Sequence, residues 1–211
     1  MLKLDQITVQ YGALTALNAV SLVITEGTIS VIDGHHGAGK SSLLKAIIGA
    51  VPSKGNVWLD QRLISQRSPA YLLQAGVVLV PEGRQLFGRL STRENLQFGL
   101  YVAGGRGSIE AALEYFPQLL PLLDKPAYVL SGGQAQMLAM ARAMLANPRY
   151  LLADEPLMGL SEGPREQVWQ ILIDLRDRGV GILVTGEHIV TRGTVIQQHK
   201  IINNGSFELG E

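Results

Sequence analysis

The first part of the chain alternates polar and apolar residues, and the strands expected after it are short and almost wholly apolar. The alternation in LKLDQITVQY (2–11) predicts a strand with one buried face. VSLVITEG (20–27) predicts a second strand, and the apolar, β-branched TISVID (28–33) predicts a strand buried on both faces. GNVWLD (55–60) and QRLIS (61–65) predict a hairpin.

Helical periodicity begins in SSLLKAIIGA (41–50) and is ended by Gly49 and Pro52. It becomes the main pattern between residues 85 and 142. Three segments there have the helical period: TRENLQFGLYVA, SIEAALEYF and GGQAQMLAMARAML. Glycine-rich joints such as GGRG separate them, so this stretch is expected to be a group of short helices.

Further apolar runs predict more buried strands, namely AGVVLVPEG (75–83), YLLADEP (150–156) and GILVTGEH (181–188). REQVWQILIDLRDRG (165–179) predicts an amphipathic helix between the last two. TVIQQHKIINNGSFEL (194–209) predicts two short strands around the turn NNG.

The order strand, helix, strand predicts a mainly parallel sheet with helical crossovers, which is an α/β fold. A length of 211 residues suits one large domain. We expect one domain (1–211), with residues 1–84 and 143–211 as its α/β core. The core begins with an antiparallel β subdomain, and residues 85–142 form an inserted helical subdomain.

The segment VIDGHHGAGKSS (31–42) contains the pattern G-x-x-x-x-G-K-[ST] at Gly34, Gly39, Lys40 and Ser41. Glycines let successive backbone N–H groups point at phosphate oxygens, and the helix that follows adds the positive end of its dipole. Because a buried strand precedes the loop and a helix follows it, we expect the phosphate loop of a P-loop NTPase. Lys40 is expected at the β- and γ-phosphates, and Ser41 at Mg²⁺.

Two adjacent histidines in this loop, His35 and His36, raise the alternative of a transition-metal site. Neighbouring side chains in a tight loop diverge, and no acidic cluster lies close in the sequence. We therefore expect both histidines to occupy variable positions of the phosphate loop.

Two acidic residues, Asp154 and Glu155, end the apolar run YLLADEP. Such a pair can cap a helix, but a carboxylate beside a phosphate loop can also hold Mg²⁺, and its neighbour can activate water. Upstream, LSGGQ (130–134) precedes a helix, where Ser131 and two glycines form a second anion-binding helix start.

Taken in order, these motifs resemble the ATPase subunits of ATP-binding cassette (ABC) transporters over essentially the whole chain. The resemblance implies a RecA-like core, an aromatic stacking on adenine at Tyr11, a D-loop at Gly159 and Leu160, and a switch histidine at His188. Lys40, Glu155 and His188 are the implied catalytic residues. The implied ATP-binding residues are Tyr11, Gly34, His35, His36, Gly37, Ala38, Gly39, Lys40, Ser41, Ser42, Glu82, Ser131, Gly132, Gly133, Gln134 and Asp154. Mg²⁺ would be held by Ser41, Glu82 and Asp154.

The segment VPEGRQLFGRLSTRENL is similar to the importer branch for branched-chain amino acids and related amides. Glu82 stands there where most of the family has Gln. Other departures are His36 for Asn or Ser, Leu157 for the Ser after DEP, Ser161 for Asp or Ala, and the pair Ser41–Ser42. The D-loop changes leave open a regulatory subunit that hydrolyses ATP poorly.

The composition limits the kinds of partner and chemistry that the chain can have. Lys plus Arg and Asp plus Glu both number 18, so the formal net charge is 0, which disfavours broad nucleic-acid binding. The chain has no cysteine, which excludes disulfides and thiol chemistry, and its start lacks the pattern of a signal peptide. No apolar run reaches the roughly 18 residues that span a bilayer.

The resemblance then implies an identical or different ABC ATPase as dimer partner and integral membrane permease subunits. It also implies an indirect solute-binding protein and a peripheral place on the cytoplasmic face of the cell membrane. A soluble, non-transport ABC ATPase is the remaining alternative, although such chains usually carry a coiled coil or a second cassette.

Overall fold

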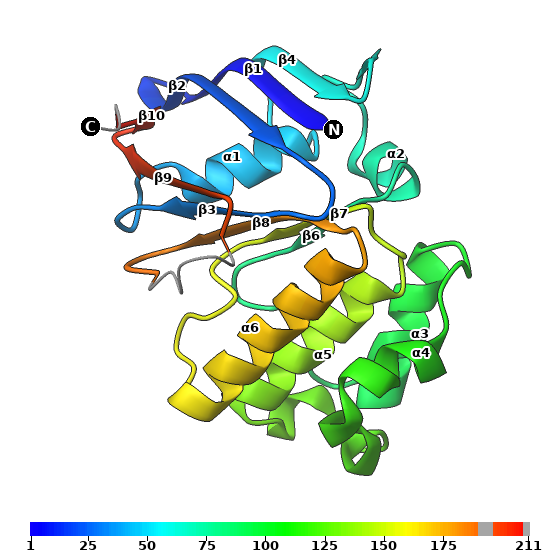
Figure 1. Ribbon diagram of the computed structural model, residues 1–211. Helices are drawn as coiled ribbons and strands as arrows, with labels where there is room; N and C mark the ends of the chain where they lie inside the picture. Colours follow the sequence, from blue (N-terminus) through cyan, green and yellow to red (C-terminus); the bar gives the residue numbers. More distant parts are fainter. Residues whose placement is uncertain (190–195, 209–211) are drawn as a thin grey trace.

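The computed structural model describes residues 1–189 and 196–208, and Figure 1 shows two sheets with helices between and below them. A four-stranded antiparallel sheet has the strand order β2-β1-β4-β5. Its strands are β1 (Leu2–Tyr11), β2 (Leu14–Ile24), β4 (Lys54–Leu59) and β5 (Arg62–Leu63). This sheet is the expected antiparallel β subdomain, although β2 begins six residues earlier than its sequence pattern indicates.

The second sheet has the order β10-β9-β3-β8-β7-β6 and carries the site. Every neighbouring pair from β9 to β6 is parallel, and β10 alone pairs antiparallel, with β9. Its strands are β3 (Ile29–Asp33), β6 (Val77–Val80), β7 (Tyr150–Ala153), β8 (Gly181–Gly186), β9 (Gln198–Asn203) and β10 (Ser206–Phe207). The expected α/β fold with a mainly parallel sheet is confirmed. Residues 194, 195 and 209 of the last expected hairpin lie outside the described residues.

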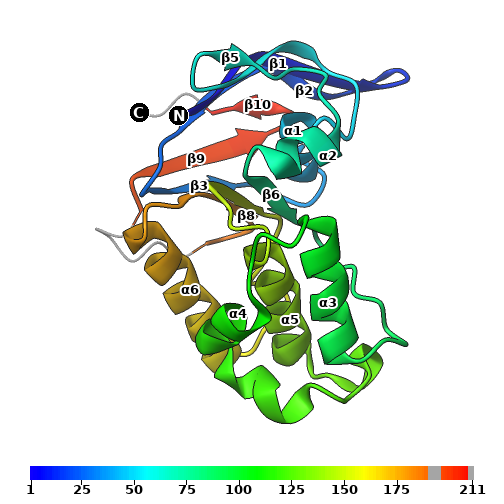
Figure 2. The same cartoon turned by 90° about the vertical axis from the view of Figure 1, so that its right-hand side faces the viewer.

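The helices cover both faces of this parallel sheet. The first face carries α1 (Lys40–Ile47) and α2 (Pro69–Gln74), and α1 fills the space up to the antiparallel sheet. Figure 2 shows α3, α4, α5 and α6 together on the opposite face. Their bounds are α3 (Thr92–Val102), α4 (Ile109–Tyr115), α5 (Gly132–Met144) and α6 (Glu162–Asp177), with 3₁₀ turns η1 (Pro117–Leu122) and η2 (Ala127–Val129) before α5.

Residues of β8 show why its strand pattern is continuously apolar. Leu183 packs in the cluster shared with α1 and the antiparallel sheet, whereas Ile182 and Val184 pack in the cluster beneath, with α5 and α6. Because successive side chains of a strand point to opposite faces, a strand covered on both sides must be apolar at every position. The continuous apolar pattern of the buried strands therefore follows from the layers that cover both faces of the sheet.

Local sequence signals set several helix boundaries. Ser91 and Glu94 form a capping box at the start of α3. Ser161 is the N-cap of α6, which begins three residues before the periodic run at 165–179. The six-residue α2 was not expected, because it is too short to show a period, but Ser68 caps it and Pro69 opens it. Within the described part of the chain, no helix has the length and apolarity needed to cross a membrane.

Candidate active site

The loop between β3 and α1 has the geometry that its glycines require. Gly39 has φ 110°, a left-handed conformation, and a Cβ there would collide with the backbone oxygen of Ala16. A Cβ at Gly34 would collide with the backbone oxygen of Ile202 on β9. The loop is thus wrapped closely between neighbouring strands, and glycine is needed at both positions.

Lys40 begins α1, and its side chain is only 3% exposed. Its ammonium donates to the carbonyl oxygens of Gly34 at 2.5 Å and His35 at 3.0 Å, which folds the lysine back over the loop. It also lies 3.0 Å from Glu155 Oε1. A buried lysine held by two loop carbonyls and a carboxylate places a positive charge at this loop, where it could neutralise a phosphate.

Asp154 and Glu155 follow β7 and are fixed by one residue of β8, Thr185. The Thr185 hydroxyl donates to Asp154 Oδ1 at 2.8 Å and accepts from the Glu155 backbone N–H at 3.1 Å. Asp154 is 4% exposed and Thr185 is fully buried. Glu155 has φ 49°, so the hydroxyl holds it in a left-handed turn that aims its carboxylate at Lys40. Thr185 leaves one oxygen of Asp154 available to another ligand.

The loop after β8 is tied to the start of the phosphate loop. Asp33, the last residue of β3, accepts hydrogen bonds from the backbone N–H groups of His188 (Oδ1, 2.9 Å) and Ile189 (Oδ2, 2.9 Å). His35 Nδ1 lies 3.1 Å from Glu187 Oε1. The rings of His35 and His188 are 6.1 Å apart, centroid to centroid, in an edge-on arrangement. His188 therefore stands beside the phosphate loop.

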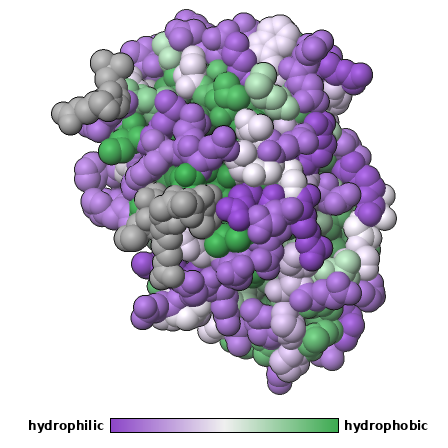
Figure 3. All heavy atoms as spheres, viewed as in Figure 1, coloured by the Kyte–Doolittle hydropathy of each residue, from purple (hydrophilic) through white to green (hydrophobic). Residues whose placement is uncertain are grey.

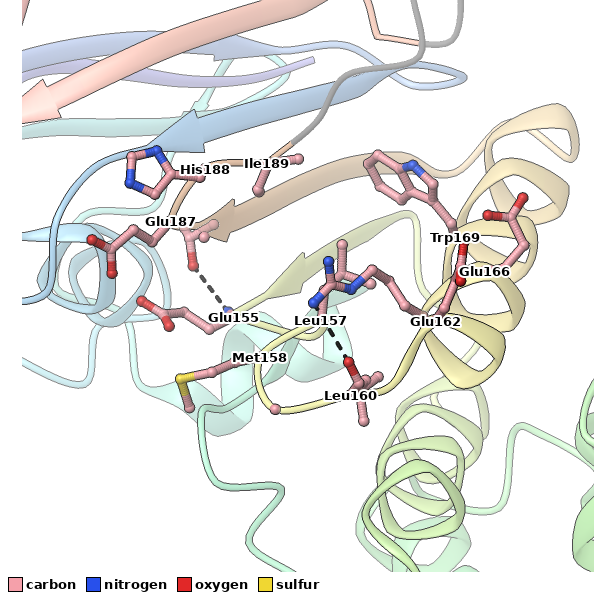
Figure 4. A pocket seen from close by; sticks show the side chains of 14 residues that line it. Glu155, Leu157, Met158, Leu160, Glu162, Glu166, Trp169, Glu187, His188 and Ile189 are labelled. Carbon is pink, nitrogen blue, oxygen red and sulfur yellow. Dashed lines mark hydrogen bonds between the residues drawn. The ribbon is translucent and has the colours of Figure 1, made fainter.

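A hollow of about 710 Å³ opens next to this loop, and Figure 4 shows the side chains around it. The Glu155 and Glu187 carboxylates point to the same side of the hollow, where β7 and β8 end. Trp169 and Glu166 of α6 line its other side, and the Gly159–Leu160 turn closes it below. The ends of two neighbouring parallel strands thus deliver their polar side chains to one edge of the sheet.

Other expected site residues lie on both sides of the loop. Tyr11 is 44% exposed at the end of β1, and the Ser42 hydroxyl donates to its hydroxyl at 3.4 Å. His36, Gly37 and Ala38 are loop residues, and Ser41 lies half-buried in the first turn of α1. Glu82 follows β6 and is half-buried. Among the described residues, its carboxylate makes no hydrogen bond or ion pair.

The structure does not bring the LSGGQ segment to the phosphate loop. Ser131 and Gln134 form a capping box that starts α5, with Gln134 N–H to Ser131 Oγ at 3.3 Å and Ser131 N–H to Gln134 Oε1 at 3.0 Å. The 13 residues of α5 make it about 20 Å long, and its last turn is the end near the sheet. Gly133 packs against Pro164, while Gly132 is exposed. Ser131 to Gln134 thus lie at the end of α5 that is far from the sheet, where Gly132 is exposed.

Three residues that the motifs do not mark contribute to this arrangement. Thr185 fixes the acidic pair, and Asp33 fixes the loop after β8. In the sequence, both could have been noticed as polar residues near the end of an apolar strand. Arg84 donates from Nε to the buried Gln136 Oε1 of α5 at 3.2 Å, and Arg142 Nη2 donates to the Arg84 carbonyl at 3.2 Å. Burial lowers the pKa of Arg142. These contacts join the turn after β6 to α5, and no local pattern predicts them.

Known proteins with similar sequences and structures agree with this geometry. A family model described as ABC transporter matches residues 17–158. The high-affinity branched-chain amino acid transport ATP-binding protein BraG of Pseudomonas aeruginosa is 31% identical over 209 residues, covering 97% of this chain and 90% of BraG. The Fe(3+) ions import ATP-binding protein FbpC 2 of Haemophilus influenzae is 35% identical over 207 residues, covering 88% of this chain and 56% of FbpC 2.

A solved structure extends the likeness to the fold. The dimeric post-hydrolysis state of an ATP-binding cassette bound to ADP and Pi matches with a TM-score of 0.86 and 26% identity, covering 100% of this chain and 98% of that one. That structure is a dimer in the product state of ATP hydrolysis. The family match spans more than half of the chain, and BraG matches nearly all of it. The chain therefore belongs to the ABC transporter family and is an ATPase of the ABC type.

Proposed function

We propose that this chain is the ATP-binding and ATP-hydrolysing subunit that powers an ABC importer, for branched-chain amino acids or related amides. The observation that carries the proposal is the buried contact between Lys40 and Glu155, beside a loop whose close packing requires glycine at Gly34 and Gly39. Bound nucleotide would replace Glu155 as the partner of the lysine. That exchange would free the carboxylate to act on water.

Four side chains at the site have roles in the proposed reaction. Lys40 and the loop amides neutralise the β- and γ-phosphates, and Tyr11 stacks on the adenine ring. Glu155 accepts a proton from the attacking water, and His188 contacts the γ-phosphate. Adding positive charge where negative charge develops is the main means by which such sites accelerate phosphoryl transfer.

The donor set around the loop fits Mg²⁺. The Ser41 hydroxyl, the available oxygen of Asp154 and the Glu82 carboxylate, which has no partner among the described residues, are all hard oxygen ligands. Held by these residues, Mg²⁺ would supply positive charge that neutralises the phosphates. Thr185 keeps the Asp154 carboxylate oriented for this contact.

The position of LSGGQ supports a site shared between two subunits. Ser131 to Gln134 lie about 20 Å from the sheet along α5, so they are remote from nucleotide on the phosphate loop of their own chain. This start of α5, where Gly132 is exposed, would instead meet the γ-phosphate of ATP held by a second ABC ATPase subunit, identical or different. The dimeric cassette among the similar structures supports this arrangement.

An apolar groove supports a membrane partner. It measures about 560 Å³ and is bounded by α2 and β6 of the core and by α3 and α5. Phe87 and Phe98 line it with their rings 4.6 Å apart, and they are 41% and 43% exposed. The face of the molecule in Figure 3 is mostly hydrophilic. Exposed apolar side chains that gather in one groove mark a site of interaction with a partner. We assign the groove to a permease segment, and residues 85–142 to the subdomain that moves with it.

Two observations support the proposed substrate class. BraG, which covers nearly the whole chain, is named for branched-chain amino acid transport. Glu82 and the turn that follows it match the importer branch recognised in the sequence. A solute-binding protein would deliver the substrate to the permease without touching this chain.

A second candidate is a regulatory subunit with weak hydrolysis, which the D-loop favours. Leu157 packs against the core below the sheet, in place of the serine expected there. Ser161 occupies the N-cap position of α6 but makes no capping hydrogen bond with its side chain, so this departure removes no cap contact. Tight ATP binding with negligible turnover in the assembled complex would favour the regulatory role.

The experiment is purification of the tagged chain from its own cells, followed by identification of its partners and measurement of ATP turnover. The proposal expects the chain in the membrane fraction, on the cytoplasmic face, bound to integral permease subunits. Phe98→Asp should release it from them and leave the turnover of the free protein unchanged. Glu114→Asp, a change at an exposed position of α4, is the control. Recovery on ribosomes or DNA, with no membrane protein attached, would overturn the proposal.

A further inference from the structure

We propose that Asp33 is a positioning residue for ATP hydrolysis, because its carboxylate fixes the loop that carries His188 against the phosphate loop. The inference rests on the proposed role of His188 at the γ-phosphate. Asp33 itself would touch neither nucleotide nor metal.

The geometry of the carboxylate is specific. One oxygen accepts from the His188 N–H and the other from the Ile189 N–H, both at 2.9 Å. Hydrogen bonds to a charged acceptor are about twice as strong as neutral ones. The Asp33 side chain is 15% exposed, so water competes poorly for these two amides. Two consecutive N–H groups on one carboxylate fix both the place and the orientation of the loop.

The conformation that Asp33 holds is one that the chain would not adopt by itself. His188 has φ 54°, in the left-handed region that residues other than glycine seldom occupy. Such a conformation persists only where the surroundings determine it. In Figure 4, His188 and Ile189 stand at the end of β8 and point to different sides, with the histidine directed away from the hollow. The two hydrogen bonds accepted by Asp33, called the clamp below, therefore decide which way the imidazole of His188 faces.

Apart from a longer contact with His199, the Asp33 carboxylate has no polar partner outside the His188 loop among the described residues. It directly precedes Gly34, so its carboxylate lies next to a loop that must receive phosphate anions, and it would repel them. The only contacts of its side chain among the described residues are the two amides and His199, whose Nε2 is 3.6 Å from Oδ2. An acid kept beside an anion site, with both oxygens committed to the His188 loop, indicates a positioning role.

A second contact ties the same loop to the phosphate loop. His35 Nδ1 and Glu187 Oε1 are 3.1 Å apart. The His35 side chain is 77% exposed, so this contact is weaker than the clamp. The contacts of Asp33 and of His35 each join residues more than 150 positions apart in the sequence. Both connect the start of the phosphate loop with the loop after β8. Movement of the phosphate loop would therefore be passed directly to His188.

The test compares Asp33→Asn and Asp33→Ala with wild type in steady-state ATP turnover. Asn keeps one acceptor and turns an NH₂ group toward the other amide, so kcat should fall about tenfold, and more in Asp33→Ala. The KM for ATP should stay the same or decrease, because a negative charge near the phosphates is removed. Asp124→Asn, an exposed acid of the helical segment, is the control and should keep wild-type kcat.

Two readouts separate positioning from a general loss of structure. Amide hydrogen exchange in the peptide covering residues 186–189 should quicken in Asp33→Asn, with the rest of the described core unchanged. In a His188→Ala background, Asp33→Asn should lower kcat less than twofold further. Unchanged exchange in that peptide, or effects of the two changes that multiply, would overturn the inference.

The outcomes also separate this inference from the proposed function. Turnover that survives Glu155→Gln would overturn the proposed function itself. Turnover that is lost in Glu155→Gln and His188→Ala, but kept within twofold in Asp33→Asn, would overturn only the role of Asp33.

Discussion

Replacement of Thr185 by valine tests how the acidic pair is held in place. Valine has nearly the shape of threonine, so the packing of β8 is kept while the hydroxyl is removed. The variant loses the hydrogen bond to Asp154 Oδ1 at 2.8 Å and the one from the Glu155 N–H at 3.1 Å. Because Thr185 is fully buried, water cannot enter to replace them.

The expected loss of stability follows from these two bonds. A hydrogen bond to a charged group contributes about 1.5–3 kcal/mol, and a neutral one about 0.5–1.5 kcal/mol. The free energy of unfolding should therefore fall by about 3 kcal/mol, and the Tm by roughly 6–12 °C for a chain of this size. Thr185→Ser keeps the hydroxyl and loses one methyl group, which is worth about 1 kcal/mol.

Urea titrations followed by circular dichroism measure both variants against wild type. The account predicts that Thr185→Val is clearly less stable than Thr185→Ser. It also predicts that kcat falls in Thr185→Val, because Glu155 loses the contact that holds its left-handed turn. A Thr185→Val protein as stable and as active as Thr185→Ser would refute the idea that the hydroxyl fixes the acidic pair.

Three further predictions concern single features of the chain. His36→Asn should leave the KM and kcat for ATP within about threefold, less than ~1 kcal/mol, since the exposed ring fills a variable loop position; a larger loss in turnover assays would show a direct role. Arg149 beside Glu26 holds the pKa of that carboxyl below its usual value, so the pair stabilises the fold above the unfolded-state pKa, and this contribution disappears as the pH falls through the folded-state pKa. The pair is about half exposed, so Glu26→Gln should flatten the acid limb of the pH–stability curve by no more than about 1 kcal/mol, and an unchanged limb would contradict the pairing. Gly133→Ala would place a Cβ 2.8 Å from Pro164 Cβ, so it should push α5 and α6 apart and destabilise by about 1–3 kcal/mol in urea titrations, whereas an unchanged midpoint would argue against that contact.

Features of the chain that depend on local pattern could be read from the sequence. The buried strands and the glycine loop were predicted because two-sided covering and close backbone approach leave direct marks in residue type. The structure gives the physical reason for these residue types. At Gly34, for example, the backbone of β9 lies too close to leave room for a Cβ. The position of Lys40 in the loop also followed from spacing alone.

Features that depend on distant parts of the chain could not be read in this way. Thr185 meets Asp154 from 31 positions away, and Asp33 meets His188 from 155 positions away. Such contacts are set by the order of strands in the sheet, and a single sequence carries no periodic signal for them. A polar residue at the end of an apolar strand was the one available hint, and it does not name its partner.

Glu155, which lies against Lys40, is proposed to be the base for ATP hydrolysis. Phosphate release from Mg-ATP should be measured for wild type and Glu155→Gln, together with the affinity of each for ATP. The account predicts turnover lower by about a hundredfold or more in the variant, as expected for loss of a general base, with ATP affinity equal or higher. Equal turnover in the two proteins would contradict it.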